Sequence, residues 1–291
     1  MPSRLRDAVF GRDTWAYLLV VAIAVATVAG LALWSRGAEQ TAVLRPAAPV
    51  ESPSASALPA ASVPPAKPAP NGLPAFSYFK APRGFPADST PLSTTAVTEG
   101  LRLTTGRVVY DKPGGTPRAV LPAVLSGLPV TVPVVERRTG WVAVLLPTTN
   151  RRVGWLTAAG SAPVRLRDQL VLRRRTHELT WLRDGVRRGG WTVTTGAPAT
   201  ATPLGRTFVL GRVVPQGRVY AGLDALALGS IPDDPDSLPA SLQAGHTAIH
   251  GWYQPSAFGR SISNGCIRVP KKGQRSLLKS IAIGTVVNVV D

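Results

Sequence analysis

The sequence contains one cysteine, Cys266, which lies in segment 261–268 with two serines, an asparagine, a glycine and an arginine. A thiol with a pKa near 8.5 is only about 3% thiolate at pH 7, so nucleophilic chemistry requires a base close by. The three histidines, His177, His246 and His250, all precede the cysteine, which excludes papain-like peptidases, whose cysteine comes first. His250 lies sixteen residues upstream, so the chain has room to leave a strand, loop round and return.

Glycines accompany both residues: Gly251 follows the histidine, and Gly265 precedes the cysteine. Glycine allows close backbone approach and unusual dihedral angles where a substrate must pass. We expect the backbone N–H groups of Gly265 and Cys266 to form an oxyanion hole. A lone cysteine is often only a small buried hydrophobe, and a lone histidine is usually a hydrogen-bonded structural group. The catalytic interpretation therefore depends on the two residues occurring together within one motif.

A zinc site formed by His246, His250 and Cys266 is an alternative, because His-x-x-x-His is a ligand spacing on helices. Here that spacing falls in a β-like run that ends in glycine. The acidic loop 222–245 lacks the ligand spacing and the terminal glutamate of a calcium hand. We therefore expect neither a metal nor an organic cofactor.

The histidine–glycine pair and the Ser-x-Gly-Cys-Ile-Arg segment 263–268 together resemble the signature of the YkuD-type L,D-transpeptidase family. Segments 194–196 (Thr-Thr-Gly) and 202–205 (Thr-Pro-Leu-Gly) resemble two further family segments, in the same order. The resemblance covers about residues 163–290. It implies a thiol enzyme that cuts the bond after the diaminopimelate of a peptidoglycan tetrapeptide and releases D-alanine. The side-chain amine of a second stem peptide then resolves the acyl-enzyme, which gives a 3→3 cross-link.

Carried over to this sequence, the resemblance makes Cys266 the nucleophile and His250 the base. It also implies that the carbonyl of Gly251 orients the imidazole. Ser263 and Arg268 are expected to shape the site, Arg268 either by pairing with a carboxylate or by holding the loop.

Three further residues are expected at the substrate. Many family members have a histidine directly before Gly-Cys, where this chain has Asn264. An amide is not a base at neutral pH, so any proton-shuttle role at that position is lost. His246 would share a strand face with His250, as a structural or substrate-lining residue. Tyr253, which closely follows His250, is expected to contact substrate.

Other functions remain open at this point. A sortase also uses a cysteine for transpeptidation, but its histidine lies much further upstream. An L,D-carboxypeptidase, or an enzyme that attaches a protein to peptidoglycan, would use the same acyl-enzyme with a different acceptor. A non-catalytic cell-wall-binding protein is the alternative from another class, and the intact histidine and cysteine argue against it.

Upstream of these motifs, residues 99–162 contain short β runs separated by turn residues, which predicts a small β-barrel. The runs lie at 108–110, 130–132, 141–145 and 154–156. A Val-Tyr-Asp-x-Pro-Gly entry, a Gly-Trp-Val-x-Val strand and a final Gly-Trp-Leu resemble a bacterial SH3-like domain. This resemblance implies a wall-binding or positioning module, and a packing domain without its own ligand is the alternative.

The last part, 163–291, is predicted to be a mainly β catalytic domain that positions the histidine and the cysteine. Strands are expected at 170–172, 178–182, 191–194 and 285–290. Asp184 and Gly185 predict a hairpin turn, and a single helix is expected over 272–281.

The N-terminal residues predict where the protein lies relative to the cell membrane. Residues 15–34 carry no charge and, at 1.5 Å per residue, would span about 30 Å, the thickness of a bilayer core. Three arginines precede this span, so 1–14 are expected to be cytoplasmic and the rest outside the cell membrane. A cleaved signal peptide is the alternative, because 24–26 (Ala-Val-Ala) resemble a cleavage site.

Residues 35–98 are predicted to be a tether, because twelve prolines lie between positions 46 and 91. Four aromatic residues, Phe76, Tyr78, Phe79 and Phe85, are unusual for a solvated linker, and docking on the folded part is the alternative for them.

The chain has 33 Lys and Arg against 16 Asp and Glu, a formal net charge of +17. Outside the membrane this excess favours anionic wall polymers or phospholipid as neighbours, and nucleic acid is not expected. Peptidoglycan stem peptides are the expected substrate.

Overall fold

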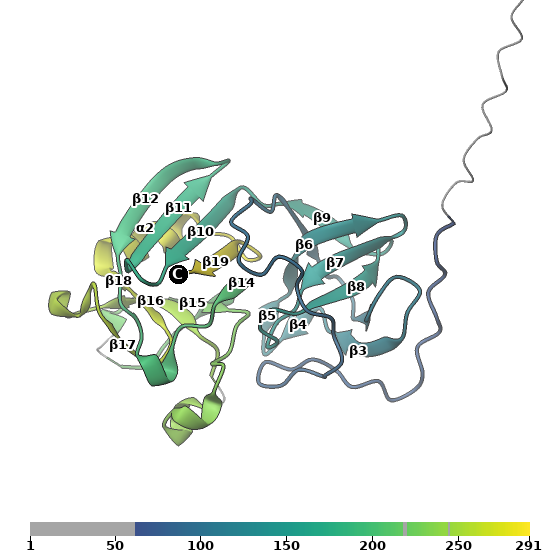
Figure 1. Cartoon of the computed structure of the whole chain (residues 1–291), viewed down its shortest axis with the longest axis horizontal. Coiled ribbons are helices and arrows are strands. Elements are labelled where there is room, and N and C mark those ends of the chain that lie inside the picture. The colour runs from purple at the N-terminus through teal and green to yellow at the C-terminus, as the bar shows by residue number, and fades with distance from the viewer. Residues whose placement is uncertain (1–61, 218–219, 244) are drawn as a thin grey trace, which may run out of the picture. The chain divides into compact units, whose positions relative to one another are not determined.

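The computed structural model describes residues 62–217, 220–243 and 245–291 (Figure 1). These residues are mainly β, with a single α-helix among them, which confirms the mainly β part of the predicted fold class. The predicted cytoplasmic tail, membrane span and first part of the tether lie outside the described residues. Within the described ranges, none of the helices is long and apolar enough to cross a membrane.

The N-terminal half forms a seven-stranded sheet in the order β3-β2-β8-β7-β6-β1-β9. Its strands are β1 (Glu99–Arg102), β2 (Arg107–Tyr110), β3 (Pro117–Leu121), β6 (Thr131–Arg138), β7 (Trp141–Leu145), β8 (Val153–Thr157) and β9 (Ala162–Arg165), and a small hairpin of β4 (Val124–Leu125) and β5 (Leu128–Pro129) is inserted. The strands expected from the β runs are therefore present, and the resemblance to an SH3-like domain stays a prediction.

Strand β7 is buried along its whole length, because both of its faces are covered. Val142 and Val144 point into the main core of this sheet. Trp141 packs on the other face against Tyr110, with ring centroids 5.1 Å apart. The Trp141 indole N–H donates to the carbonyl of Pro64 at 2.9 Å, so residues near position 64 cover this aromatic face.

The segment 74–88, which we call the strap, differs from the tether expected over 35–98. Phe76 and Phe85 are 2% and 6% exposed, and both belong to the core of the first sheet. Tyr78 is half-buried, whereas Phe79 is 61% exposed. Burial of the two phenylalanines stabilises by about 2 kcal/mol each, which outweighs the poor strand-forming tendency of the neighbouring prolines. The docking alternative is thus correct for Phe76 and Phe85.

Backbone and ionic contacts also hold the strap. Ala75 forms a parallel bridge with Val120, and Ala87 pairs with Arg152. The buried carboxylate of Asp88 accepts hydrogen bonds from the guanidinium of Arg206 in the second sheet, at 2.8 Å from Nε. The strap is therefore a fixed part of the fold.

The C-terminal half forms an eight-stranded sheet in the order β12-β11-β10-β19-β14-β15-β16-β18. Its strands are β10 (Asp168–Arg173), β11 (Glu178–Arg183), β12 (Val186–Thr192), β14 (Gly205–Val213), β15 (Ala225–Leu228), β16 (Ala248–Trp252), β18 (Ile267–Pro270) and β19 (Val286–Val290). A separate pair joins β13 (Thr195–Gly196) to β17 (Ser261–Ser263), and α2 is Lys271–Ser280. Short 3₁₀ turns are η1 (Pro198–Thr200), η3 (Pro235–Ser237), η4 (Ala240–Leu242) and η5 (Pro255–Ala257).

In this half, the predicted turn and helix agree closely with the structure. The predicted turn at 184–185 joins β11 to β12, and both of its residues have positive φ. The predicted helix starts one residue earlier than expected, directly after Pro270. Strand β9, which begins at the predicted boundary between 162 and 163, pairs with β1 and so belongs to the first sheet.

Strands β16 and β18 are the elements that position the motif residues. They are parallel neighbours at one edge of the eight-stranded sheet (Figure 1), and His250 is in register with Arg268. Ile249 and Ile267 are also paired, and both are fully buried in the core of this sheet. Because these apolar side chains anchor both strands, the register of the residues beside them is fixed.

Candidate active site

His250 and Cys266 open into the same pocket, which has a volume of about 250 Å³. His250 lies in the middle of β16, and Cys266 directly precedes β18. His246, Asn264 and Arg268 also line this pocket. The structure therefore gathers five of the residues that the sequence assigned to the site.

His250 is 4% exposed, and its orientation is set by one hydrogen bond. Its Nδ1 lies 2.9 Å from the carbonyl oxygen of Gly251. A carbonyl only accepts, so Nδ1 carries the proton and Nε2 keeps its lone pair for a base. Burial, and to a smaller extent the charge of Arg268, lowers the pKa of His250 to about 4. The imidazole is therefore neutral at neutral pH, and the expected role of the Gly251 carbonyl agrees with this geometry.

Cys266 is partly exposed at its pocket. Burial of the sulfur raises the pKa of this thiol, whereas the N–H of Ala248 and the charge of Arg268 act in the opposite direction. The resting site thus pairs a neutral thiol with a neutral imidazole, and thiolate formation requires proton transfer to the base.

The loop before the cysteine is held by Ser263, which is 1% exposed. Its Oγ donates to the carbonyl of Cys266 at 2.6 Å and accepts from the N–H of Gly265 at 3.2 Å. Gly265 has φ +101°, which favours glycine at this position. The N–H of Gly265 donates inside the loop in this structure, and the oxyanion hole expected from Gly265 and Cys266 stays a prediction. Ser263 and Gly265 shape the loop.

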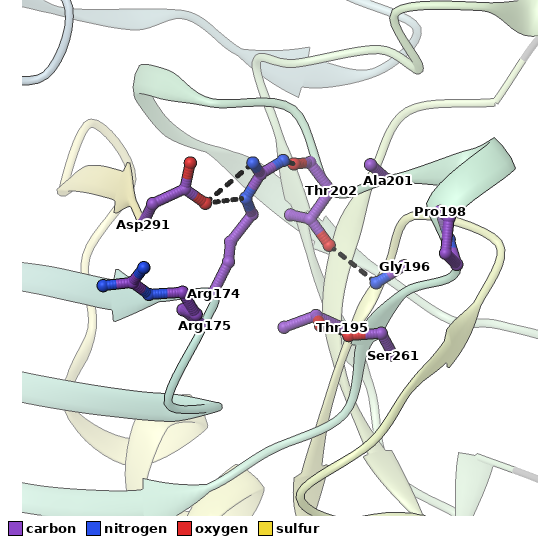
Figure 2. Close-up of a pocket in the computed structure, with 9 residues that line it drawn as sticks. All are labelled: Arg174, Arg175, Thr195, Gly196, Pro198, Ala201, Thr202, Ser261 and Asp291. Atoms are coloured by element: carbon purple, nitrogen blue, oxygen red, sulfur yellow. Dashed lines mark hydrogen bonds and ion pairs between the residues drawn. The ribbon is translucent and has the colours of Figure 1, made fainter.

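Thr202 supports the same loop from behind. Its hydroxyl donates to the carbonyl of Gly265 at 2.9 Å. The same hydroxyl accepts from the N–H of Gly196 at 3.0 Å (Figure 2). The backbone carbonyl of Thr202 accepts from Arg174, which also pairs with Asp291 (Figure 2). The Thr-Thr-Gly and Thr-Pro-Leu-Gly segments thus brace the cysteine loop, a role that their local sequence did not reveal.

Arg268 provides the fixed positive charge of the pocket. Its guanidinium lies 3.7 Å from the ring centroid of Trp252, which also lines the pocket. Its Nε is buried and has no hydrogen-bond partner among the described residues. A planar guanidinium held in this way can receive a carboxylate through two parallel hydrogen bonds.

His246 forms part of the pocket wall. Its Nδ1 contacts the carbonyl of Leu228, and its Nε2 lies 2.5 Å from the carbonyl of Tyr78 in the strap. Both ring nitrogens lie against backbone carbonyls, and a neutral ring donates its one N–H to one of them. Burial lowers the pKa of this histidine. This geometry fits the expected role of His246 as a structural or substrate-lining residue.

Two tyrosines depart from the sequence-based site. Tyr253 is 59% exposed and packs on Trp252, but it does not line the pocket, so the structure does not bring this expected residue into the site. Tyr220, which no motif signalled, lines the pocket and meets the ring of His250 edge-on at 4.9 Å. Tyr220 lies in a loop, where apolar and polar residues follow no regular period, so no sequence pattern indicated its role.

No cluster of three or more His, Cys, Asp or Glu suited to a metal ion occurs within 62–217, 220–243 and 245–291. The pocket combines a neutral histidine, a thiol and a fixed guanidinium. Together these groups can carry out acyl transfer through a thioester.

Residues 167–289 match the family model of the L,D-transpeptidase catalytic domain, YkuD. No curated protein matches the chain.

Three solved structures are similar to this chain. One is an L,D-transpeptidase from Mycobacterium smegmatis, with 15% identity, 52% of this chain and 90% of that chain covered, and a TM-score of 0.34. Another is L,D-transpeptidase 3 from Mycobacterium tuberculosis in complex with a faropenem-derived adduct, with 14% identity, coverages of 65% and 95%, and a TM-score of 0.38. An L,D-transpeptidase from Stackebrandtia nassauensis has 14% identity, coverages of 43% and 55%, and a TM-score of 0.32. The likeness to the L,D-transpeptidase catalytic domain, YkuD, therefore covers residues 167–289, which is less than half of the chain.

Proposed function

We propose that this protein is a membrane-anchored L,D-transpeptidase that forms 3→3 cross-links in peptidoglycan through a thioester on Cys266. The observation that carries the proposal is the neutral imidazole of His250, whose Nε2 is left as the acceptor in the pocket that also contains the thiol.

In the acylation step, His250 Nε2 takes the proton of the thiol as the sulfur attacks the carbonyl carbon after diaminopimelate. The carbon–sulfur bond forms, and the imidazolium then gives its proton to the departing amine of D-alanine as the carbon–nitrogen bond breaks. The Gly251 carbonyl stabilises the imidazolium that exists between these events. The low pKa of His250 favours the return of that proton to the leaving group.

In the second step, the side-chain amine of another stem peptide attacks the thioester. His250 takes a proton from the amine, the new carbon–nitrogen bond forms, and the carbon–sulfur bond breaks to restore the thiol. Water in place of the amine would give an L,D-carboxypeptidase, and an amine of a protein would give protein attachment. The acceptor therefore decides which of these activities results.

Arg268 is proposed to hold a carboxylate of the donor stem peptide. Its guanidinium is oriented by stacking on Trp252, and it lines the pocket that contains Cys266. Asn264, also in the pocket lining, is proposed to contact the same peptide with its amide.

The location of the protein is also a proposal. Residues 15–34 would anchor it in the cell membrane with 1–14 in the cytoplasm and the catalytic domain on the wall side. The first sheet is proposed to be an SH3-like positioning module, and the net charge of +17 would favour contact with anionic wall polymers.

Mass spectrometry of the full chain after incubation with a carbapenem tests the acyl-enzyme. We expect a single covalent adduct on the native chain and none on the Cys266→Ala variant. Incubation with purified tetrapeptide muropeptides should then give dimers with a 3→3 linkage. A native chain that takes up no adduct and forms no product would instead support a non-catalytic wall-binding protein.

A further inference from the structure

A second and larger cavity, of about 550 Å³, lies where the strap meets two loops, and we call it the cationic cavity. Residues 79–85 of the strap line it. Its other lining residues are Thr148, Thr149 and Arg152 of the loop between β7 and β8, and Ile231 of the catalytic domain. Residues of both sheets' connecting loops therefore contribute to one hollow.

The charge of this cavity has one sign. Lys80, Arg83 and Arg152 are basic, and none of the described residues that line it is acidic. Arg152 is held in place because one of its terminal N–H groups donates to the carbonyl of Phe85 at 3.2 Å. Phe79 adds an exposed aromatic ring, 61% accessible. Such a lining favours a ligand that carries carboxylates on a partly apolar frame.

Hydrogen bonds within the strap fix the turn that lines this cavity. The Ser77 N–H donates to the carbonyl of Lys80, and the Lys80 N–H donates back to the Ser77 hydroxyl at 3.0 Å. This turn directs Tyr78 towards His246, whereas the next residue, Phe79, lines the cationic cavity. A preformed site avoids the entropy cost of ordering a loop on binding.

The cationic cavity adjoins the cysteine pocket at two points. Ile231 lines the cationic cavity, and its chain neighbour Pro232 lines the cysteine pocket. Tyr78, the chain neighbour of Phe79, contacts His246 in the pocket wall, with ring centroids 4.1 Å apart. At these two points, residues that line the two hollows are therefore chain neighbours or contact each other through Tyr78.

We propose that the cationic cavity binds the carboxylates of the acceptor stem peptide, an inference that rests on the proposed transpeptidase function. When the donor is attached to Cys266, it occupies the cysteine pocket, and the acceptor must bind beside it to bring its amine to the thioester. The neighbouring cavity remains open in that state. The amine attacks the thioester carbon, the carbon–nitrogen bond forms, the carbon–sulfur bond breaks, and His250 passes the proton from the amine to the leaving sulfur.

The test compares the full native chain with the double variant Lys80→Gln/Arg83→Gln, and with Arg173→Gln/Arg188→Gln as a control. Both double variants remove two positive charges, and the control positions lie on exposed parts of β10 and β12. Neither cavity residue touches Cys266, so acylation by a carbapenem should be unchanged in all three proteins and shows that each is folded.

With tetrapeptide muropeptides, we expect the cavity variant to form about tenfold less cross-linked dimer and relatively more tripeptide from hydrolysis. The control should keep the native ratio. An unchanged ratio in the cavity variant, or an equal loss of donor acylation, would overturn the proposal.

A binding measurement separates this inference from the proposed activity. Calorimetry with the same muropeptide should show about tenfold weaker binding to the cavity variant than to the control, even if the native chain forms no product. Equal binding to both variants would refute the inference, as would a cavity that binds polyphosphate but not the muropeptide.

Discussion

The cysteine pocket and the cationic cavity lie side by side but are built in opposite ways. The cysteine pocket rests on two paired strands, and its histidine is 4% exposed and neutral. The cationic cavity is formed by a strap and loops, with basic side chains and an aromatic ring open to solvent.

This difference separates two tasks. Proton transfer between a thiol and an imidazole needs fixed geometry and exclusion of water. Burial provides both, and it also disfavours the charged forms of these two groups. Recognition of a charged peptide needs fixed charges that solvent and substrate can reach. Changes in the buried pocket should therefore have large effects that are insensitive to salt, whereas changes in the open cavity should have smaller, salt-dependent effects.

The largest expected effect comes from His250→Gln. Loss of the base should slow acylation by a carbapenem by a factor of about 10² to 10⁴. His246→Gln, in the same pocket wall, is the matched control and should slow it less than about tenfold. Stopped-flow measurement of adduct formation checks this, and an equal loss in both variants would mean that the roles of the two histidines are wrongly assigned.

The buried histidine also predicts a pH dependence of stability. Its pKa is about 4 in the fold and near 6.5 in an unfolded chain, so between these values only the unfolded state carries the proton. Stability from this residue is present above about pH 6.5 and is lost as the pH falls towards 4, by about 3 kcal/mol. Urea unfolding of native chain and His250→Gln at both pH values measures this. A native chain that loses no more stability than the variant would contradict it.

A smaller effect is expected from Thr202→Val, which keeps the shape but removes the hydroxyl between Gly196 and Gly265. Leaving these buried backbone groups unpaired should cost about 1–3 kcal/mol of unfolding free energy. Acylation should slow by about tenfold, because the cysteine loop loses its support. Thr200→Val, which removes a single bond to Ser263, is the control and should change both quantities less. Equal effects of the two variants would argue against a special role for Thr202.

The smallest effect concerns salt. Raising the ionic strength from about 0.05 to about 0.5 M should weaken transfer to a muropeptide acceptor severalfold, because exposed charges are screened. Acylation of Cys266 by a carbapenem should stay within about twofold over the same range, because the pocket chemistry starts from neutral groups. Rates of both steps, measured by chromatography of products and by mass spectrometry, decide this. Equal salt dependence of the two steps would remove the distinction between the two regions.

Local signals predicted much of the fold. The turn at 184–185, the helix after Pro270 and the strand at Trp141–Leu145 all follow from residue types within a few positions. The strap did not, because its prolines indicate a solvated chain when read locally. Its packing depends on the sheet that receives Phe76, and that sheet is formed by residues beyond position 98.

The site shows the same division. The sequence indicated Cys266 and His250 because the chain offers one thiol and few imidazoles, and acyl transfer needs both. It did not show that the N–H of Gly265 donates to the Ser263 hydroxyl, because the direction of that hydroxyl depends on the fold of the loop. It missed Tyr220, because only the folded path of a loop brings this residue against the imidazole of His250.

The sequence by itself determined which chemical groups are present and where strands and turns begin, because composition and short-range periodicity depend on neighbouring residues. Only the tertiary structure decided that the imidazole is neutral, that Thr202 braces the cysteine loop, and that the strap forms a cationic cavity beside the thiol pocket. The physical reason is that burial, hydrogen-bond partners and shared walls arise between residues far apart in the chain, and local patterns carry no record of those partners.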